Sequence, residues 1–360
     1  MMKKLKILNI VVAKVWGGGE QYVYDTSKAL AERKHKVYIA VDQSNTVLQK
    51  RFAEAGEIFT CDLYSLGGLK SIWKLSNFVK KQKIDIVNCH SGHAMLLCTL
   101  LKFLTGVKIV SFRHNALPAK HDWYHKWQRK HTDAYICVSK LVYDLQTAGL
   151  NKEEKKKYHL VYNGIDTSKF NKYQGKFTQC EKFVIGYAGR IAENKGIDIL
   201  IEAFAKLSKK YSDMYLYIAG SDDKGYLEKL QLLIKKYGLS ERVKFLGQVH
   251  DMEKFYKSLN VFVLPSVVKE AFGLVLCEAM YCGVPVITTD SGAQKEIIDD
   301  GIDGFIVPKG DVGKLSFNIE LIYLESDKYK NFTNNATSKI KMKFSIDTCI
   351  NNLISVLSCN

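Results

Sequence analysis

The chain has 360 residues, of which 47% are apolar, 25% are charged and only four are proline. This composition is typical of a globular protein, and at about 100–200 residues per domain the length predicts two domains. The nine cysteines form no CxxC pair, which excludes a disulfide framework or a standard zinc site. They indicate buried thiols in a reducing cytosol.

The net charge of +16 lies in one half of the chain. Residues 1–180 carry 30 Lys and Arg against 14 Asp and Glu, whereas residues 181–360 carry 23 of each. Such one-sided charge favours contact with nucleic acid, anionic lipid or a polyanionic acceptor. A solvated lysine-rich surface would explain it equally simply.

The first residues of the chain predict a strand. They predict no secretory leader, because no apolar leader segment or cleavage site precedes this strand. The apolar runs are shorter than the roughly 20 residues needed to span a bilayer. We therefore expect a cytoplasmic protein, with any membrane contact peripheral and on the inner face.

Short runs rich in Val and Ile alternate with amphipathic stretches in the first half. Strands are predicted over 5–13, 36–42, 84–90, 108–114 and 133–139, and helices over 20–33 and 69–82. This alternation predicts a parallel sheet with helices on both faces.

The same pattern restarts in the second half. Strands are predicted over 183–189, 214–220, 242–247, 261–266, 284–290 and 304–308, and helices over 196–210, 225–237 and 251–258. The fold class is therefore α/β, with two Rossmann-like doubly wound domains. We place them at 1–170 and 171–344, linked through the polar stretch 165–181. Ligands bind beyond the carboxyl ends of such strands, so facing domains would form an interdomain cleft.

Two carboxylates lie in one segment after the predicted strand 261–266. Glu270 precedes a helix predicted to end at Gly283, and Glu278 lies two turns into it. Eight helical residues span about 12 Å. A nucleotide sugar has its hexose and its ribose on opposite sides of the diphosphate, so Glu270 could hold the hexose and Glu278 the ribose. Otherwise, Glu270 is only a helix-start carboxylate and Glu278 an exposed helix residue.

The start of this helix offers backbone N–H groups at Phe272, Gly273 and Leu274, which could face a phosphate. Gly273 would allow close approach of the backbone. Arg190 and Lys195 follow the strand 183–189, and both could turn toward one diphosphate. If a diphosphate is the leaving group of a reaction at this site, fixed cations would stabilise the charge that grows on it in the transition state.

The first predicted strand is followed by Gly17, Gly18, Gly19 and Glu20 at the start of a helix. Consecutive glycines can present backbone N–H groups to an anion, although a plain turn is an equally good explanation. Trp16 precedes them and could either stack on an acceptor or pack.

Two histidines end neighbouring predicted strands, His90 and His114. A histidine at the carboxyl end of a strand either faces the edge of the sheet where ligands bind or is simply packed there. Arg113 precedes His114 and either points to the opposite face or adds charge for an anionic acceptor. The spacing of the histidines fits no standard ligand set, so no metal is expected.

These motifs together resemble glycosyltransferase family 4. The pieces in order are GGGE at 17–20, SFRH at 111–114, AYICVS at 134–139, YNGID at 162–166, GRIAENKG at 189–196, EAFGLVLCEAM from 270 and DGIDGFIVP at 300–308. The resemblance covers roughly residues 10–310. It implies a GT-B fold and transfer with retention of configuration and without a metal or other cofactor.

The resemblance also implies roles for single residues. Arg190 and Lys195 match the diphosphate-binding pair, and Val249 matches the nucleobase contact. His114 matches a histidine near the reacting centre that donates a hydrogen bond to sugar or phosphate. The acceptor side would comprise Gly17, Gly18, His90 and Arg113, with Gly18 also near the donor phosphate. The fold implies that a last helix at 345–360 packs back on the N-terminal domain.

A basic and aromatic stretch covers 120–131, where Trp123 and Trp127 share one helical face. Such a helix suits an anionic lipid interface. The alternative is that its tryptophans pack on the sheet while its cations stay solvated. No nucleic-acid motif is present, so no nucleic-acid partner is expected.

The sequence thus predicts a hexosyltransferase that uses a nucleotide-diphosphate sugar, UDP rather than GDP, and a glycolipid or lipid-linked saccharide acceptor. Surface polysaccharide or lipopolysaccharide biosynthesis is the expected setting. A nucleotide-sugar epimerase or hydrolase on the same fold, or a non-catalytic binding module, are the alternatives. The oligomeric state is not predicted.

Overall fold

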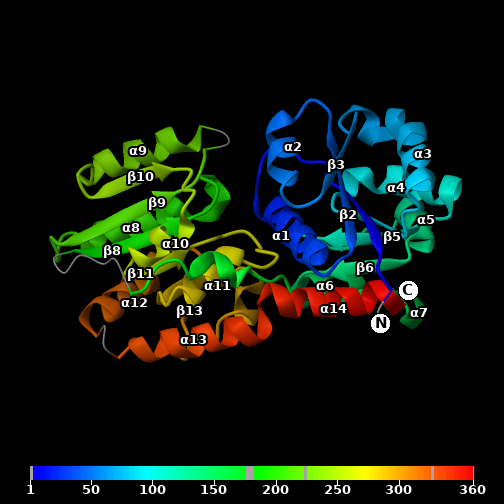
Figure 1. Ribbon diagram of the computed structural model, residues 1–360. Coiled ribbons are helices and arrows are strands. Elements are labelled where there is room, and N and C mark those ends of the chain that lie inside the picture. The colour runs from blue at the N-terminus through cyan, green and yellow to red at the C-terminus, as the bar shows by residue number, and fades with distance from the viewer. Residues whose placement is uncertain (1–2, 176–181, 223–224, 326–327, 360) are drawn as a thin grey trace. The chain divides into compact units, whose positions relative to one another are not determined.

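The computed structural model describes residues 3–175, 182–222, 225–325 and 328–359 (Figure 1). The chain divides into unit 1, residues 1–164 with 346–360, and unit 2, residues 165–345. The division precedes the predicted 170/171 boundary because Phe170 belongs with unit 2, where its ring centroid lies 6.3 Å from those of Tyr256 and Tyr281. Part of the predicted linker (176–181, with Cys180) lies outside the described residues.

Unit 1 is built on a parallel sheet with the strand order β3-β2-β1-β4-β5-β6-β7. Its strands are β1 (Lys6–Ile10), β2 (Lys36–Asp42), β3 (Glu57–Cys61), β4 (Ile86–Cys89), β5 (Lys108–Arg113), β6 (Ala134–Cys137) and β7 (Tyr158–Leu160). The sequence did not predict β3 and β7. Both lie at the sheet edges and are only partly buried, so their apolar pattern is weak.

Helices cover both faces of this sheet. They are α1 (Gly18–Glu32), α2 (Thr46–Phe52), η1 (Ser65–Ser71), α3 (Ile72–Gln82), η2 (Gly92–Ala94), α4 (Met95–Thr105), α5 (Trp123–His131), α6 (Lys140–Thr147), α7 (Lys152–Lys155) and α14 (Ile346–Cys359). Buried residues of α1 and α14, such as Tyr22 and Leu353, share one core with the strands. Leu75 of α3 and Leu101 of α4 belong to the core on the other face. The last helix is therefore part of unit 1 (Figure 1).

Unit 2 repeats this architecture, with the strand order β10-β9-β8-β11-β12-β13, all parallel. Its strands are β8 (Phe183–Ala188), β9 (Met214–Ala219), β10 (Val243–Gly247), β11 (Val261–Leu264), β12 (Val286–Thr289) and β13 (Phe305–Val307). Its helices are η3 (Thr167–Phe170), η4 (Glu193–Lys195), α8 (Ile197–Leu207), α9 (Tyr226–Lys236), α10 (Met252–Lys257), α11 (Leu274–Tyr281), η5 (Ala293–Glu296), α12 (Val312–Leu324) and α13 (Lys330–Lys343). The predicted class, two Rossmann-like doubly wound units, is confirmed.

Each sheet reverses its strand order at one place, between β1 and β4 in unit 1 and between β8 and β11 in unit 2. The carboxyl ends of these strands are where doubly wound sheets bind ligands. The residues singled out in the sequence follow β1, β4, β5, β8 and β11. No helix in the described parts of the chain is both long and apolar enough to cross a membrane.

Candidate functional site

The loop after β8 places two predicted cations at the reversal point of unit 2. Arg190 has an exposed side chain, and its carbonyl accepts a hydrogen bond of 2.9 Å from the Tyr187 hydroxyl. Lys195 ends the short η4 helix, and Gly196 follows with φ 66°. A side chain at Gly196 would place its Cβ 2.2 Å from the Pro265 carbonyl oxygen. Glycine therefore lets this loop pack directly against the end of β11.

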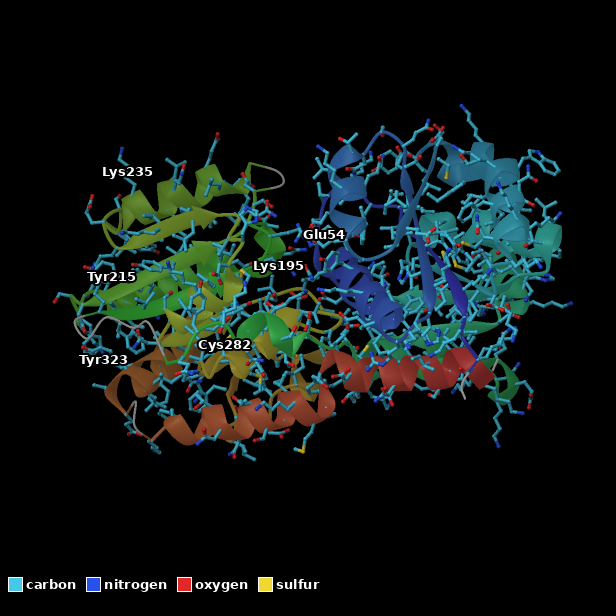
Figure 2. All side chains as sticks on the ribbon, in the orientation of Figure 1. Glu54, Lys195, Tyr215, Lys235, Cys282 and Tyr323 are labelled. Carbon is cyan, nitrogen blue, oxygen red and sulfur yellow. The ribbon has the colours of Figure 1, made fainter. Side chains whose placement is uncertain are left out.

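The ammonium of Lys195 and the carboxylate of Glu270 form an ion pair, with Nζ 2.5 Å from Oε1. Their side chains are only 15% and 16% exposed (Figure 2 labels Lys195). The Ser266 hydroxyl donates to the same oxygen at 2.6 Å. The sequence assigned Lys195 to the diphosphate and Glu270 to the sugar. The structure joins the two residues in one polar cluster.

The backbone around Glu270 is fixed as well. Its carbonyl oxygen accepts a hydrogen bond of 2.9 Å from the Ala293 N–H. A Cβ on Gly292 would lie 2.4 Å from the Glu270 nitrogen, so the two loops pack without an intervening side chain. The loop that carries Glu270 is thus held by β12 and its following turn, which favours a preformed site.

Helix α11 begins at Leu274, slightly later than predicted, with Gly273 at its N-cap (φ 123°). No side chain caps this end. Phe272 is buried, and its ring lies edge-on to Phe344 at 5.5 Å. Its side chain packs inside unit 2, so the donor contact predicted for Phe272 is restricted to the backbone.

Glu278 lies in the second turn of α11, one or two positions nearer to the helix start than predicted, because the helix starts later. Its Oε2 accepts a hydrogen bond of 2.7 Å from the hydroxyl of Tyr256 on α10. Burial, reinforced by the Glu278 charge, raises the pKa of Tyr256 well above its ordinary value. The hydroxyl therefore stays a donor and orients the carboxylate. Val249 is half-buried in the loop between β10 and α10.

In unit 1, the glycine motif belongs to the start of a helix rather than to a loop alone. Gly17 is the N-cap of α1, and no side chain caps this end. A Cβ on Gly18 or Gly19 would meet nothing within 4 Å. These two glycines leave open space at the first turn, as a closely approaching anion requires.

His90 and His114 lie side by side at the ends of β4 and β5. Their rings are stacked with centroids 5.4 Å apart, and Nδ1 of His90 is 3.1 Å from Nε2 of His114. Burial lowers the pKa of His114 to about 4. Burial and the neighbouring His114 hold the pKa of His90 well below its ordinary value. Both rings are therefore neutral at pH 7.

Arg113 and Trp16 have simple structural environments. Phe112 belongs to the core beneath α1 and α14, so its neighbour Arg113 points to the opposite face of the sheet. There its guanidinium lies 5.0 Å from the ring centroid of Tyr135. Trp16 packs between Phe52, at 5.1 Å, and the guanidinium of Arg51, at 3.5 Å. Packing is thus the role that the structure gives to Trp16.

Helix α5 fits neither alternative fully, because Lys126 and Lys130 are solvated and Trp127 packs, whereas Trp123 is exposed and Arg129 is buried. Trp123 is 79% exposed, and Trp127 stacks on Phe103 of α4 at 6.2 Å. The buried residues of α5 are instead the polar Gln128 and Arg129. The helix therefore presents aromatic rings outward.

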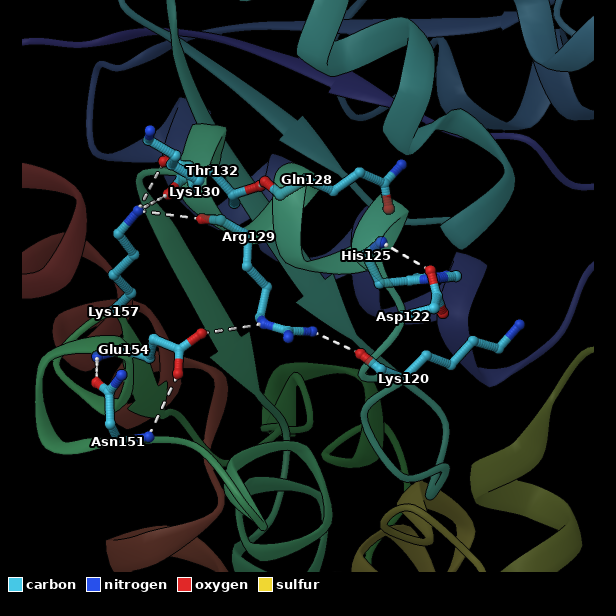
Figure 3. Close-up of polar contacts among 10 residues, drawn as sticks. All are labelled: Lys120, Asp122, His125, Gln128, Arg129, Lys130, Thr132, Asn151, Glu154 and Lys157. Atoms are coloured by element: carbon cyan, nitrogen blue, oxygen red, sulfur yellow. Dashed lines mark hydrogen bonds and ion pairs between the residues drawn. The ribbon is translucent and has the colours of Figure 1, made fainter.

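Polar contacts fasten the inner face of α5 (Figure 3). Arg129 donates to the Lys120 carbonyl at 2.6 Å and pairs with Glu154 at 3.6 Å. The Lys157 ammonium donates to three carbonyls at the helix end, those of Arg129, Lys130 and Thr132. Polar contacts thus support α5 together with the packing of Trp127 on Phe103.

Sequence reasoning missed four polar residues that hold the site: Ser266, Tyr256, Tyr187 and Asn9. Ser266 lies two residues beyond β11, a strand-end position that could have been noticed. Asn9 is an isolated polar residue inside an apolar strand, which is also a readable signal. Among the described residues, no three His, Cys, Asp or Glu side chains group as a metal site would require.

Comparison with known proteins is consistent with this geometry. Residues 16–169 match the family model described as Glycosyltransferase Family 4, and residues 169–339 match Glycosyl transferases group 1. The capsular polysaccharide biosynthesis glycosyltransferase CapM of Staphylococcus aureus is 30% identical over 310 residues, 79% of each chain. The lipopolysaccharide core biosynthesis mannosyltransferase LpcC of Rhizobium leguminosarum is 25% identical over 240 residues, 64% of this chain and 66% of that protein.

Among solved structures, Anabaena HepE in complex with UDP and glucose superposes with a TM-score of 0.83 at 22% identity, over 99% of this chain and 100% of that one. The fold and the matches define a glycosyltransferase of the GT-B type. The chain belongs to glycosyltransferase family 4.

Proposed function

We propose that the protein is a retaining, metal-independent hexosyltransferase that uses a UDP-sugar rather than a GDP-sugar. Its acceptor is a glycolipid or lipid-linked saccharide in the biosynthesis of a surface polysaccharide or lipopolysaccharide. In the proposed reaction the bond from the anomeric carbon to the diphosphate breaks, and a bond to the acceptor oxygen forms on the same face. The acceptor proton passes to the leaving diphosphate, which needs no other cofactor.

The observation that carries this proposal is the Lys195–Glu270–Ser266 cluster at the reversal point of unit 2, on whose β8 loop Arg190 also lies. Lys195 and Arg190 supply charge for a diphosphate without a metal, and hydrogen bonds to charged groups contribute about 1.5–3 kcal/mol each. Glu270 serves the sugar hydroxyls and Glu278 the ribose. The similarity to proteins named as glycosyltransferases favours transfer over an epimerase, a hydrolase or a pure binding module.

Names and ligands of similar proteins support the donor and the acceptor class. UDP with glucose, and UDP with GlcNAc, were bound in structural neighbours. CapM is named for capsular polysaccharide and LpcC for the lipopolysaccharide core. LpcC is also named a mannosyltransferase, so a GDP-sugar is the rival donor to test.

The test is a thermal-shift panel with UDP, GDP, ADP and CMP, each with magnesium and with EDTA. A ligand at 100 times its Kd stabilises the fold by about 2.7 kcal/mol. We expect UDP to raise Tm equally under both conditions. A shift that requires magnesium would contradict metal independence, and a shift from GDP alone would reverse the donor assignment.

Product analysis tests the chemistry itself. With the donor selected by the panel, NMR of the product formed on a lipid-linked acceptor should show the anomeric configuration of the donor. Free sugar formed at the same rate without acceptor would indicate a hydrolase. An inverted product would contradict the retaining mechanism.

We also propose that the enzyme works on the inner face of the cytoplasmic membrane, as a peripheral protein that contacts anionic lipid through α5. Two exposed rings lie there, Trp123 of α5 and Phe103 of the neighbouring helix α4, which are 79% and 57% exposed. The exposed Lys120, Lys126 and Lys130 lie on or beside the same helix. Aromatic rings among cations suit the interface of an anionic bilayer.

Flotation with phosphatidylglycerol vesicles at low salt tests the membrane contact. Wild-type protein should float, and Trp123→Ser should float several-fold less. Val47→Ser is the matched control, since Val47 is a 74% exposed apolar residue of α2 in the same unit. Failure of the wild type to float would contradict the contact but leave the transferase proposal standing.

A further inference from the structure

Four polar side chains of unit 1 form a continuous hydrogen-bonded chain that ends at His114. Ser27 on α1 accepts from Nδ2 of Asn9 on β1 at 3.0 Å. Oδ1 of Asn9 lies 3.0 Å from Nε2 of His90. Nδ1 of His90 in turn lies 3.1 Å from Nε2 of His114. The chain links residues up to 105 positions apart through β1, α1 and the ends of β4 and β5.

The orientation of the Asn9 amide sets the direction of the hydrogen bonds that lead from Asn9 to His114. Its Nδ2 faces Ser27, and its Oδ1 also accepts from Nδ2 of Asn88 at 2.9 Å. A carbonyl oxygen can only accept, so Nε2 of His90 must carry the proton. A neutral His90 then has a bare Nδ1, which accepts from the Nε2–H of His114. The bare nitrogen of His114 is consequently Nδ1.

The surroundings keep both rings neutral and in place. Phe112 packs on His90 with centroids 4.4 Å apart, and Tyr22 lies edge-on to His114 at 5.1 Å. Burial among these rings disfavours an imidazolium, in agreement with the lowered pKa of each histidine. Nδ1 of His114 has no hydrogen-bond partner within the described parts of the chain, so it is available to a ligand.

We propose that Asn9 and His90 set the tautomer of His114, so that its Nδ1 accepts a hydrogen bond from a hydroxyl of the donor sugar. Asn9 and His90 are then positioning residues for glycosyl transfer. The role at the sugar rests on the proposed function, whereas the tautomer does not. His114 becomes an acceptor for a hydroxyl, where the sequence suggested a donor to sugar or phosphate. Hydroxyl recognition of this kind selects against a deoxy sugar, because the buried acceptor would then lose its partner.

The tautomer can be measured on the enzyme without substrate. Nitrogen-15 NMR of histidine-labelled protein at pH 7, with His114→Gln and His90→Gln for assignment, distinguishes protonated from bare ring nitrogens. We expect both His90 and His114 to be protonated on Nε2 and bare on Nδ1. A proton on Nδ1 of His114, or an imidazolium, would overturn the proposal whether or not the protein transfers sugar.

The positioning role is tested by kinetics with the full chain. His90→Phe keeps a ring against Phe112 but removes both hydrogen bonds, and we expect kcat to fall about 10–100-fold, as for other orienting partners. The KM for the donor should change less than threefold. His90→Gln can still accept from His114 and donate to Asn9, so it should recover most of the loss. His159→Phe is the matched control, a half-buried histidine on β7 outside this chain, and should retain wild-type kcat.

The outcomes separate this inference from the proposed function. An unchanged kcat in a folded His90→Phe, checked by circular dichroism and Tm, would overturn the positioning role. If the wild type transfers no sugar, donor binding is followed instead by NMR. The His114 Nδ1 resonance should then shift on addition of the UDP-sugar but not of UDP. No shift with a bound UDP-sugar would equally contradict the contact.

Discussion

The two units place polar groups at the same point of the same fold but prepare them in opposite ways. Unit 2 keeps charges, since Lys195 and Glu270 pair at 2.5 Å with Arg190 close by in sequence. Unit 1 has neutral rings instead, since burial keeps His90 and His114 from becoming imidazolium ions. A preformed charge suits a diphosphate that becomes more anionic in the transition state, whereas neutral hydrogen-bonding groups suit sugar hydroxyls.

The largest effect is expected for a substitution in the charged cluster of unit 2. Lys195→Ala removes one of the two cations proposed to stabilise the leaving diphosphate, so kcat should fall about 100–1,000-fold. Steady-state kinetics with the UDP-sugar is the measurement. Lys235→Ala is the control, because Lys235 is an exposed lysine of α9 in the same unit (Figure 2). Equal kinetics for the two variants would remove Lys195 from the mechanism.

The neutral histidines of unit 1 should make the stability of the protein depend on pH. The pKa of His114 falls from an ordinary value of 6.5 to about 4 in the folded protein. Below pH 6.5 this histidine therefore binds a proton in the unfolded chain but not in the folded one. The free energy of unfolding consequently decreases as the pH falls toward 4. Between pH 7 and 4.5, wild type should lose about 2 kcal/mol more than His114→Gln.

Urea unfolding of both proteins at the two pH values measures this difference. His90 and Tyr22 are the titratable groups whose rings lie against His114, and both are retained in the variant. Parallel pH profiles for wild type and variant would show that His114 is not held neutral. The contrast between the two units would then be lost.

The smallest effect is expected for Tyr256 of unit 2, whose neutral hydroxyl orients the Glu278 carboxylate. Tyr256→Phe removes the hydroxyl that donates to Glu278 at 2.7 Å, which should raise the Kd for UDP about threefold to tenfold. Calorimetric titration measures it. Tyr211→Phe, which removes a hydroxyl bonded to Glu320 on α12, is the control and should bind UDP normally. A Kd unchanged by Tyr256→Phe would show that Glu278 needs no such support.

The sequence by itself determined the architecture and most of the residues of interest. Buried central strands such as β1 and β8 give continuous apolar runs, because both of their faces are covered. Their ends could therefore be located, and with them Arg190, Glu270 and His114. The short edge strand β7 and the polar anchoring of α5 could not be predicted, because neither follows a local apolar period.

Only the tertiary structure decided which of these residues meet. Lys195 and Glu270 are 75 positions apart and pair because β8 lies next to β11. Asn9 and His90 are 81 positions apart and bond because β1 lies next to β4. Strand order is set by long-range packing rather than by local periodicity. The strand order therefore determines which residues pair. It also determines that the site in unit 2 is charged and that the site in unit 1 is neutral.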